Sequence, residues 1–263
     1  MMTSLRCGLP RLCLLLCLLG AHGLGRAESP LGASALSGEE AGQRQQDAEN
    51  DPELYLQLIA GMQEKNLYFA ALAHLDAFDR RWPGNSRAAL LRADALRETA
   101  YLERAKAIYR SLLQGEQSAG AFHGLGIIAG RQGDRPAALE AMGKANQLAP
   151  TNVAILNDLG YLQLLDGQLD EARLSLHKAA ELDQRNARVG GNLALLYLLD
   201  KKPERAAGIM KWYQLPESSR QEIYRRAGEA GGGVADAAHK TAEFDAAGEK
   251  IDKVEAVPPQ PRK

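Results

Sequence analysis

Histidine, cysteine and acidic side chains are the residues most able to do chemistry in this chain, but their spacing forms no recognisable catalytic or metal-binding motif. The histidines after residue 27 lie far apart, without the His-x-x-x-His or Glu-x-x-His spacing of a zinc site. All three cysteines fall within the first 17 residues. The glycines of GLGIIAGRQG follow no predicted strand, so they do not predict a phosphate-binding loop. The sequence therefore predicts no catalytic residue, no metal site and no cofactor, and a protein that is not an enzyme.

The regular placement of small residues is the strongest signal in the chain. When residues 119 and 153 each begin a unit of about 34 residues, Gly126 and Gly160 share the eighth position, and Gly133 and Gly167 share the fifteenth. Glycine at the eighth position is expected to let two helices approach closely, and glycine at the fifteenth to form the turn between them. The residues that fit this repeat are Gly126, Gly133, Ala138, Pro150, Leu159, Gly160, Gly167, Ala172, Ala179, Ala194 and Ala206.

This repeat is the tetratricopeptide (TPR) pattern, in which each unit is a pair of antiparallel helices. One pair cannot bury its apolar face alone, so successive pairs stack around a continuous core. The sequence therefore predicts an all-α, right-handed TPR superhelix (an α-α solenoid) with about four to five repeats and a C-terminal capping helix. The TPR domain is predicted over residues 52–230, with repeats at 52–85, 86–118, 119–152, 153–186 and 187–215 and the cap at 216–230.

The first helix of each predicted pair is expected to face a concave groove. That face mixes apolar side chains with amide and guanidinium groups, which suits an extended or helical peptide of a protein partner. Tyr161 and Leu195 could instead be buried between helices, and His123 could be an ordinary packing histidine. The candidate groove residues are His123, Ile127, Arg131, Asn157, Tyr161, Leu164, Arg188, Asn192 and Leu195, with Asp94 and Arg97 from the second unit.

The two ends of the chain differ from the repeats in composition. Residues 1–27 combine Arg6 and Arg11 with the apolar run LCLLLCLLG and end in small residues, which predicts a secretion signal peptide cleaved before Glu28. A short membrane anchor is the alternative, and so is lipid attachment at Cys17, although Leu16 is not the small residue that a lipoprotein signal has there. Residues 28–51 are predicted to be a flexible linker, and residues 231–263 a low-complexity, disordered tail.

Charge composition bears on the kind of partner. The formal net charge is −1, with Lys and Arg nearly balanced by Asp and Glu, and no basic stripe is evident. Nucleic-acid-binding proteins usually carry such a stripe. We therefore expect protein partners and no nucleic acid.

The segment after residue 155 resembles a narrower family. Arg188 followed by Asn192-Leu193-Ala194-Leu195 is similar to the start of the last repeat in the TadD family of tight-adherence (Tad/Flp) pilus assembly proteins, and the resemblance covers roughly residues 51–226. It implies an exported protein, periplasmic or associated with the outer membrane, that helps to build the secretion apparatus of a type IVb pilus. The implied partners are the secretin or its accessory proteins, and the implied outcome is adherence and biofilm formation.

Other functions compatible with the sequence are a general periplasmic TPR adaptor for another cell-envelope or cytochrome-biogenesis complex, and an enzyme whose TPR region only binds substrate. The enzyme is disfavoured because, outside the TPR units and the two terminal segments, little sequence is left to house an active site.

Overall fold

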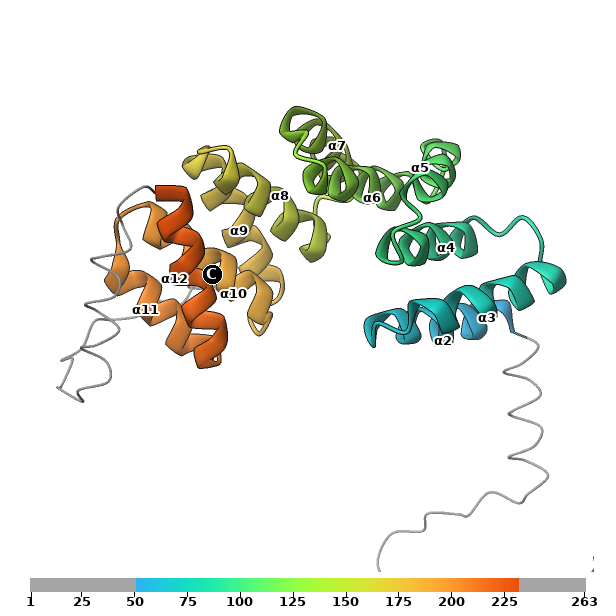
Figure 1. The fold of residues 1–263 in the computed structure, drawn as a ribbon, viewed down its shortest axis with the longest axis horizontal. Helices are drawn as coiled ribbons and strands as arrows, with labels where there is room; N and C mark the ends of the chain where they lie inside the picture. The colour runs from blue at the N-terminus through green and yellow to red at the C-terminus, as the bar shows by residue number, and fades with distance from the viewer. Residues whose placement is uncertain (1–50, 232–263) are drawn as a thin grey trace, which may run out of the picture. The chain divides into compact units, whose positions relative to one another are not determined.

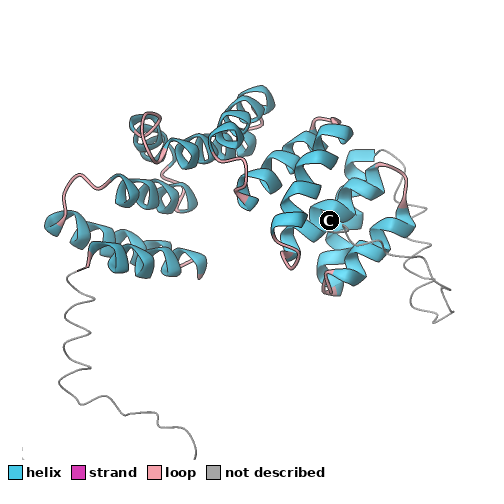
Figure 2. Cartoon of the chain, turned by 180° about the vertical axis from the view of Figure 1, so that it is seen from behind, coloured by secondary structure: helices cyan, strands magenta, loops and turns pink. Residues whose placement is uncertain are grey.

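The computed structural model describes residues 51–231, which form helices joined by short turns and include no strand (Figures 1 and 2). All of them lie within one compact unit. The predicted signal peptide, linker and tail lie outside the described residues, apart from Asp51 and Gly231. The helices are α2 (Pro52–Glu64), α3 (Tyr68–Arg81), α4 (Ser86–Glu98), α5 (Leu102–Ser111), α6 (Ser118–Arg131), α7 (Arg135–Leu148), α8 (Val153–Leu165), α9 (Leu169–Leu182), α10 (Ala187–Leu199), α11 (Pro203–Trp212) and α12 (Glu217–Gly231).

The helices form five consecutive pairs, and α12 packs on the last of them. Within a pair the two helices contact each other, and the second helix then packs against the first helix of the next pair. The first helices of neighbouring pairs also touch, so that α4, α6, α8 and α10 follow one another. This arrangement confirms the predicted all-α TPR stack with a C-terminal capping helix. No helix among residues 51–231 is both long and apolar enough to cross a membrane.

Short polar side chains begin most of the first helices. Asp51, Asn85, Asn152 and Asn186 each precede a first helix and accept hydrogen bonds from its free backbone N–H groups. Such caps contribute about 1 kcal/mol each to helix stability. The sequence thus marks the start of four pairs at the residue level.

The turn inside each pair requires a left-handed backbone. Gly133 and Gly167 have φ values of +80° and +77°. The equivalent residues in the other pairs, Asn66, Ala100 and Lys201, also have positive φ, between 56° and 65°. Glycine adopts this conformation without the Cβ penalty that other residues incur, so the turns at Ala100 and Lys201 carry local strain.

Close helix packing explains the small residues inside the pairs. A Cβ on Gly160 would lie 2.6 Å from Cγ of Leu176, and one on Gly126 would lie 3.0 Å from Cγ of Met142. Ala138, Ala172, Ala179, Ala194 and Ala206 are completely buried, and Leu159 is also buried. Pro150 is exposed in the turn before α8. A larger side chain at the buried alanines would have to push two helices apart.

Candidate functional site

A row of polar side chains joins the first helices α6, α8 and α10. His123 Nε2 lies 2.8 Å from Asp158 Oδ2, and Asn192 Nδ2 donates to Asn157 Oδ1 over 2.9 Å. Asn157 also donates to Asp158 Oδ1 over 3.1 Å, which connects these two interactions into one continuous row. Each bond between neighbouring pairs spans 35 residues in the sequence. Contacts from one repeat to the next therefore fix the side-chain geometry of this surface.

The row is electrostatically adapted to a charged carboxylate. Burial of the Asp158 carboxyl opposes its ionisation, but the hydrogen bond and charge of His123, the Asn157 amide and the charge of Arg188 outweigh that effect. The pKa of Asp158 therefore lies below its ordinary value. A carboxylate that is charged and hydrogen-bonded on both oxygens acts here as a positioning group for His123 and Asn157.

A second polar group lies on α4 and reaches α5 and α6. The Tyr109 hydroxyl donates to Asp94 Oδ1 over 2.6 Å, and Arg131 Nη2 donates to both oxygens of Glu98 at 2.9 and 3.0 Å. Burial raises the pKa of the Asp94 carboxyl, although Arg97 and the Tyr109 hydroxyl act in the opposite direction. Arg97 Nε is buried and lies 3.1 Å from Glu98 Oε1, an ion pair that lacks the geometry of a hydrogen bond.

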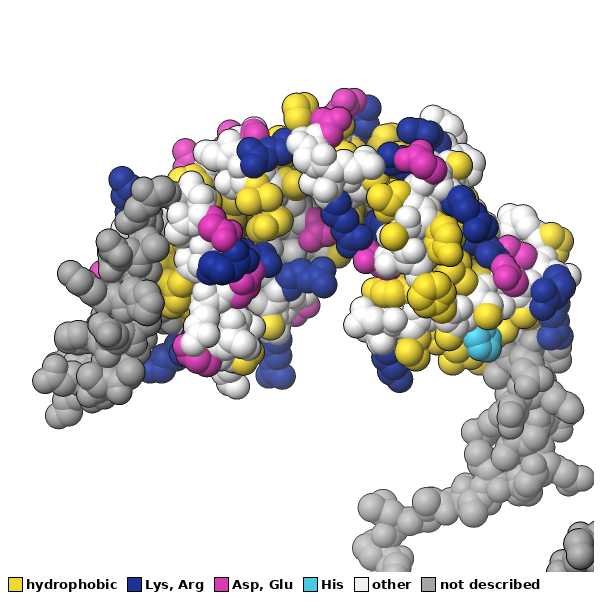
Figure 3. Space-filling model, viewed as in Figure 1, with side chains coloured by type: hydrophobic (Ala, Val, Ile, Leu, Met, Phe, Trp, Pro, Cys, Tyr) yellow, Lys and Arg dark blue, Asp and Glu magenta, His cyan; other side chains and the backbone are white. Residues whose placement is uncertain are grey.

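These residues define one surface, which we call the first-helix face. It consists of Asp94, Arg97, Glu98, His123, Arg131, Asp158, Arg188 and Asn192, and the buried Asn157 links Asp158 to Asn192. Figure 3 shows that cationic, acidic and apolar side chains are interspersed over the visible side of the molecule rather than gathered by sign. The face can offer hydrogen bonds and single charges, and it is not a continuous basic surface.

The structure corrects part of the predicted groove. Asn157, Leu164 and Leu195 are only 2%, 3% and 3% exposed, so they are not available to a partner in this structure. Both leucines belong to the core cluster around α8, α9, α10 and α11. Apolar residues surround α10 on nearly all sides, as in a helix buried within the stack.

The remaining predicted residues retain some surface. His123, Ile127, Tyr161 and Asn192 are half-buried, and Arg131 and Arg188 are exposed. The guanidinium of Arg226 on α12 lies 5.8 Å from the ring centre of Tyr161, so the capping helix partly covers this residue. Sequence reasoning missed Asp158, whose link to His123 could have been found from an offset of 35 residues instead of about 34.

The arrangement contains no set of groups for metal chemistry. Across residues 51–231, no three His, Cys, Asp or Glu side chains come together in a way that could hold a metal ion. His123 and Asp158 form a hydrogen-bonded pair, and the bonds of this pair connect repeats.

The chain is similar to known TPR proteins in sequence and in fold. No family model matches the chain. The TPR repeat-containing protein PA4299 of Pseudomonas aeruginosa is 32% identical over 195 residues, covering 73% of this chain and 78% of that protein. The thermophilic TPR protein TTC0263 of Thermus thermophilus superposes with a TM-score of 0.55 at 19% identity, over 68% of this chain and 98% of its own. The pilF structure of Pseudomonas aeruginosa gives a TM-score of 0.55 at 16% identity, over 77% and 95%.

Proposed function

Because the chain belongs to the family of TPR repeat-containing proteins, we propose that it is a non-enzymatic scaffold that holds a protein partner on the first-helix face. The observation that carries this proposal is the row His123–Asp158–Asn157–Asn192, which crosses three helix pairs. Groups already held in place lose little freedom when a partner binds, which favours affinity.

The free groups of this face indicate the chemistry of the partner. The amide nitrogen of Asn192 is used by Asn157, while its carbonyl oxygen accepts no hydrogen bond from residues 51–231. Arg188 is exposed at the start of α10, close enough to Asp158 to affect its pKa. An extended peptide can donate a backbone N–H to the Asn192 oxygen and place a carboxylate beside Arg188.

The partner that we propose is a component of a Tad/Flp pilus secretion apparatus, either the secretin or an accessory protein. The sequence resemblance at Arg188 and Asn192-Leu193-Ala194-Leu195 supports this assignment. The export signal predicted over residues 1–27 supports a periplasmic location, with or without attachment to the outer membrane.

Photo-crosslinking in living cells tests the proposed partner. A photoreactive amino acid replaces Arg188 on the first-helix face or, as the matched control, Arg135, an exposed arginine at the start of the second helix α7. The proposal predicts an adduct with a pilus-secretion protein from position 188 and a much weaker one from position 135. Equal adducts from both positions would contradict the binding surface. A strong adduct from position 188 with an unrelated envelope complex would contradict the pilus assignment and favour a general adaptor.

Cell fractionation and the intact mass of the mature protein test the location. Export with unmodified cleavage before Glu28 predicts a periplasmic protein whose mass equals that of residues 28–263. An added acyl mass at Cys17 would show a lipid anchor instead, and recovery of the uncleaved chain in the cytoplasm would contradict export.

A further inference from the structure

One position recurs at the junction where a first helix meets two second helices, that of the preceding pair and that of its own pair. Residues 96, 129, 163 and 197, which lie 33 or 34 apart, occupy this position on α4, α6, α8 and α10. Leu96 is buried in the core cluster of its junction. Gln163 accepts a hydrogen bond from Ser175 on α9 over 2.8 Å, and the Tyr197 hydroxyl lies 3.1 Å from His177 Nε2, also on α9. Three of these four junctions are therefore filled by a large side chain of the chain itself.

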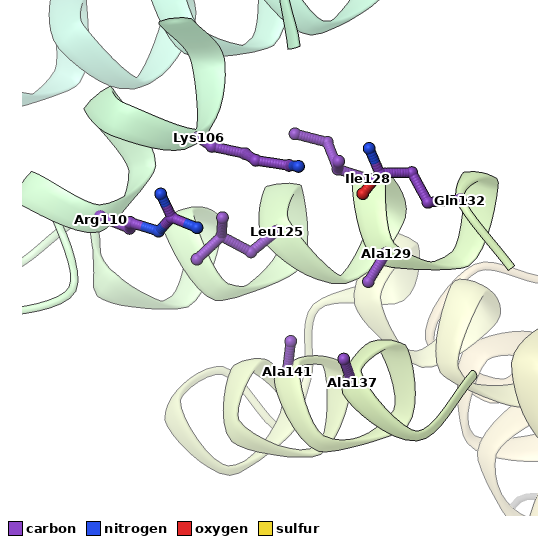
Figure 4. Close-up of a pocket in the computed structure, with 8 residues that line it drawn as sticks. All are labelled: Lys106, Arg110, Leu125, Ile128, Ala129, Gln132, Ala137 and Ala141. Carbon is purple, nitrogen blue, oxygen red and sulfur yellow. The ribbon is translucent and has the colours of Figure 1, made fainter. Parts of the chain in front are cut away.

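The remaining junction, on α6, carries Ala129 and has an open cleft. The cleft has a volume of about 260 Å³ and lies between α5, α6 and α7. In Figure 4, Lys106 and Arg110 extend from α5 over α6, while Ala137 and Ala141 of α7 present only methyl groups. The remaining lining residues are Leu125, Ile128, Ala129 and Gln132. The volume is below the roughly 300–1,000 Å³ of a site for a drug-sized ligand, and it suits one or two inserted side chains.

Charge identifies the group that accompanies the inserted side chain. Arg110 is exposed and makes no hydrogen bond or ion pair with any side chain among residues 51–231. Lys106 pairs with Glu103 at 3.0 Å on the surface, where such pairs are weak enough to exchange. Arg110 on α5 occupies the same repeat position as His177 on α9. His177 is hydrogen-bonded to the hydroxyl of Tyr197, the large side chain that fills the junction on α10. An occupant of the cleft should likewise combine an apolar body with an oxygen that reaches the cation.

We infer that the cleft between α5 and α7 is a second docking site, which receives a large apolar side chain of a protein partner with an adjacent carboxylate that pairs with Arg110. The apolar side chain takes the place left empty at Ala129, and the carboxylate binds the free guanidinium. The site is separate from the first-helix face, so a scaffold with both surfaces can hold two segments at once. Such bivalent attachment raises overall affinity without new contacts at either site.

The test uses a variant that closes the cleft with the residues of the next junction. Ala129→Gln with Ala141→Ser reproduces Gln163 and Ser175, which this fold already accommodates. A phage-displayed library of random dodecapeptides is selected on the full chain and depleted on this variant, and the most enriched peptide is labelled for fluorescence anisotropy. We expect enriched peptides with an aromatic residue or leucine next to Asp or Glu. The labelled peptide should bind the closed variant at least tenfold more weakly.

Two surface variants separate the charge from the cavity. Arg110→Glu should weaken the labelled peptide at least fivefold, whereas Arg104→Glu, an equal charge change on α5 outside the lining, should change it less than twofold. Circular dichroism confirms that each variant is folded. Enriched peptides that are basic, that lack an apolar anchor, or that bind all variants equally would overturn the proposal. The chain's own tail contains Glu-Phe-Asp at residues 243–245, which could also supply an apolar side chain next to a carboxylate. If Phe244→Ser in the full chain tightened peptide binding more than threefold, the natural occupant would be this tail, and the proposal would be overturned.

The first-helix face and the cleft fail independently in these experiments. Substitutions that abolish the crosslink at position 188 should leave peptide binding at the cleft unchanged. The variant with the closed cleft should still form the crosslink at position 188 with the same partner, in lower yield because one of the two attachments is lost.

Discussion

Gly124 should be the least replaceable glycine of the stack, although the repeat pattern points to Gly126 instead. The ring of Tyr109 on α5 packs directly on the backbone of Gly124 on α6, so a Cβ there would overlap the ring carbons. The ring has little freedom to move, because it is completely buried and its hydroxyl donates to Asp94 over 2.6 Å. We therefore choose Gly124→Ala as the perturbation.

Two opposing effects set the size of the change. Overpacking of a well-packed contact costs about 1–3 kcal/mol, and the fixed ring places this site at the upper end. Replacing Gly by Ala in a helix interior returns about 1 kcal/mol. The net expectation is a loss of roughly 2 kcal/mol in the free energy of unfolding, which lowers Tm by about 4–8 °C for a domain of this size.

Gly143→Ala is the matched control. Gly143 also lies inside a helix, α7, but a Cβ there meets no atom within 4 Å. Only the gain in helix propensity remains, so Tm should rise by about 2–4 °C. Thermal unfolding followed by circular dichroism measures both variants. If Gly124→Ala raises Tm as much as Gly143→Ala does, then α5 does not pack on α6 through Tyr109.

Three further changes are expected to be measurable. Asn192→Ala leaves the buried Asn157 oxygen unpaired and should lower the free energy of unfolding, measured with denaturant, by about 1–3 kcal/mol. Changing both residues to Leu should recover most of the lost stability, and a double variant as unstable as Asn192→Ala would contradict the pairing. The folded-state pKa of Asp158 lies below its ordinary value of 3.8, so its stabilising effect is present above that pH and is lost as the pH falls below it. The stability difference between the native chain and His123→Ala should therefore shrink as the pH falls below about 4, and a constant difference there would refute the link. Ala100→Gly relieves a left-handed backbone at φ +65° and should raise the free energy of unfolding by up to about 1 kcal/mol in the same denaturant assay. An unchanged or lower value would contradict the claim that this turn is strained.

The fold could be predicted from the sequence because its signals are local and repeat. Gly133 and Gly167 mark turns that need positive φ, and alanines such as Ala172 mark points where helices nearly touch. Each requirement arises within a single helix pair, so the glycine or alanine that meets it lies close in the sequence to the turn or helix contact that needs it. The asparagine caps at Asn152 and Asn186 follow the same logic.

The candidate site was less predictable because it depends on contacts between repeats. Leu164 and Leu195 occupy groove positions in the repeat, yet they belong to the buried core cluster that also holds residues of the capping helix. His123 and Asp158 are 35 residues apart, one more than the repeat length of about 34. The two partners therefore do not occupy equivalent positions when the repeats are aligned. The cleft at Ala129 is visible only when the side chains at equivalent junctions are compared in space.

Hydrogen–deuterium exchange of the full chain, with and without the protein captured from position 188, is the most direct test of the account. Binding on the first-helix face predicts slowed exchange in α6, α8 and the start of α10, and little change in the second helix α9, which lies outside both proposed docking sites. Protection confined to α7 and α9, or unchanged exchange in α8 at saturating partner, would contradict the claim that this scaffold holds its partner on the first-helix face.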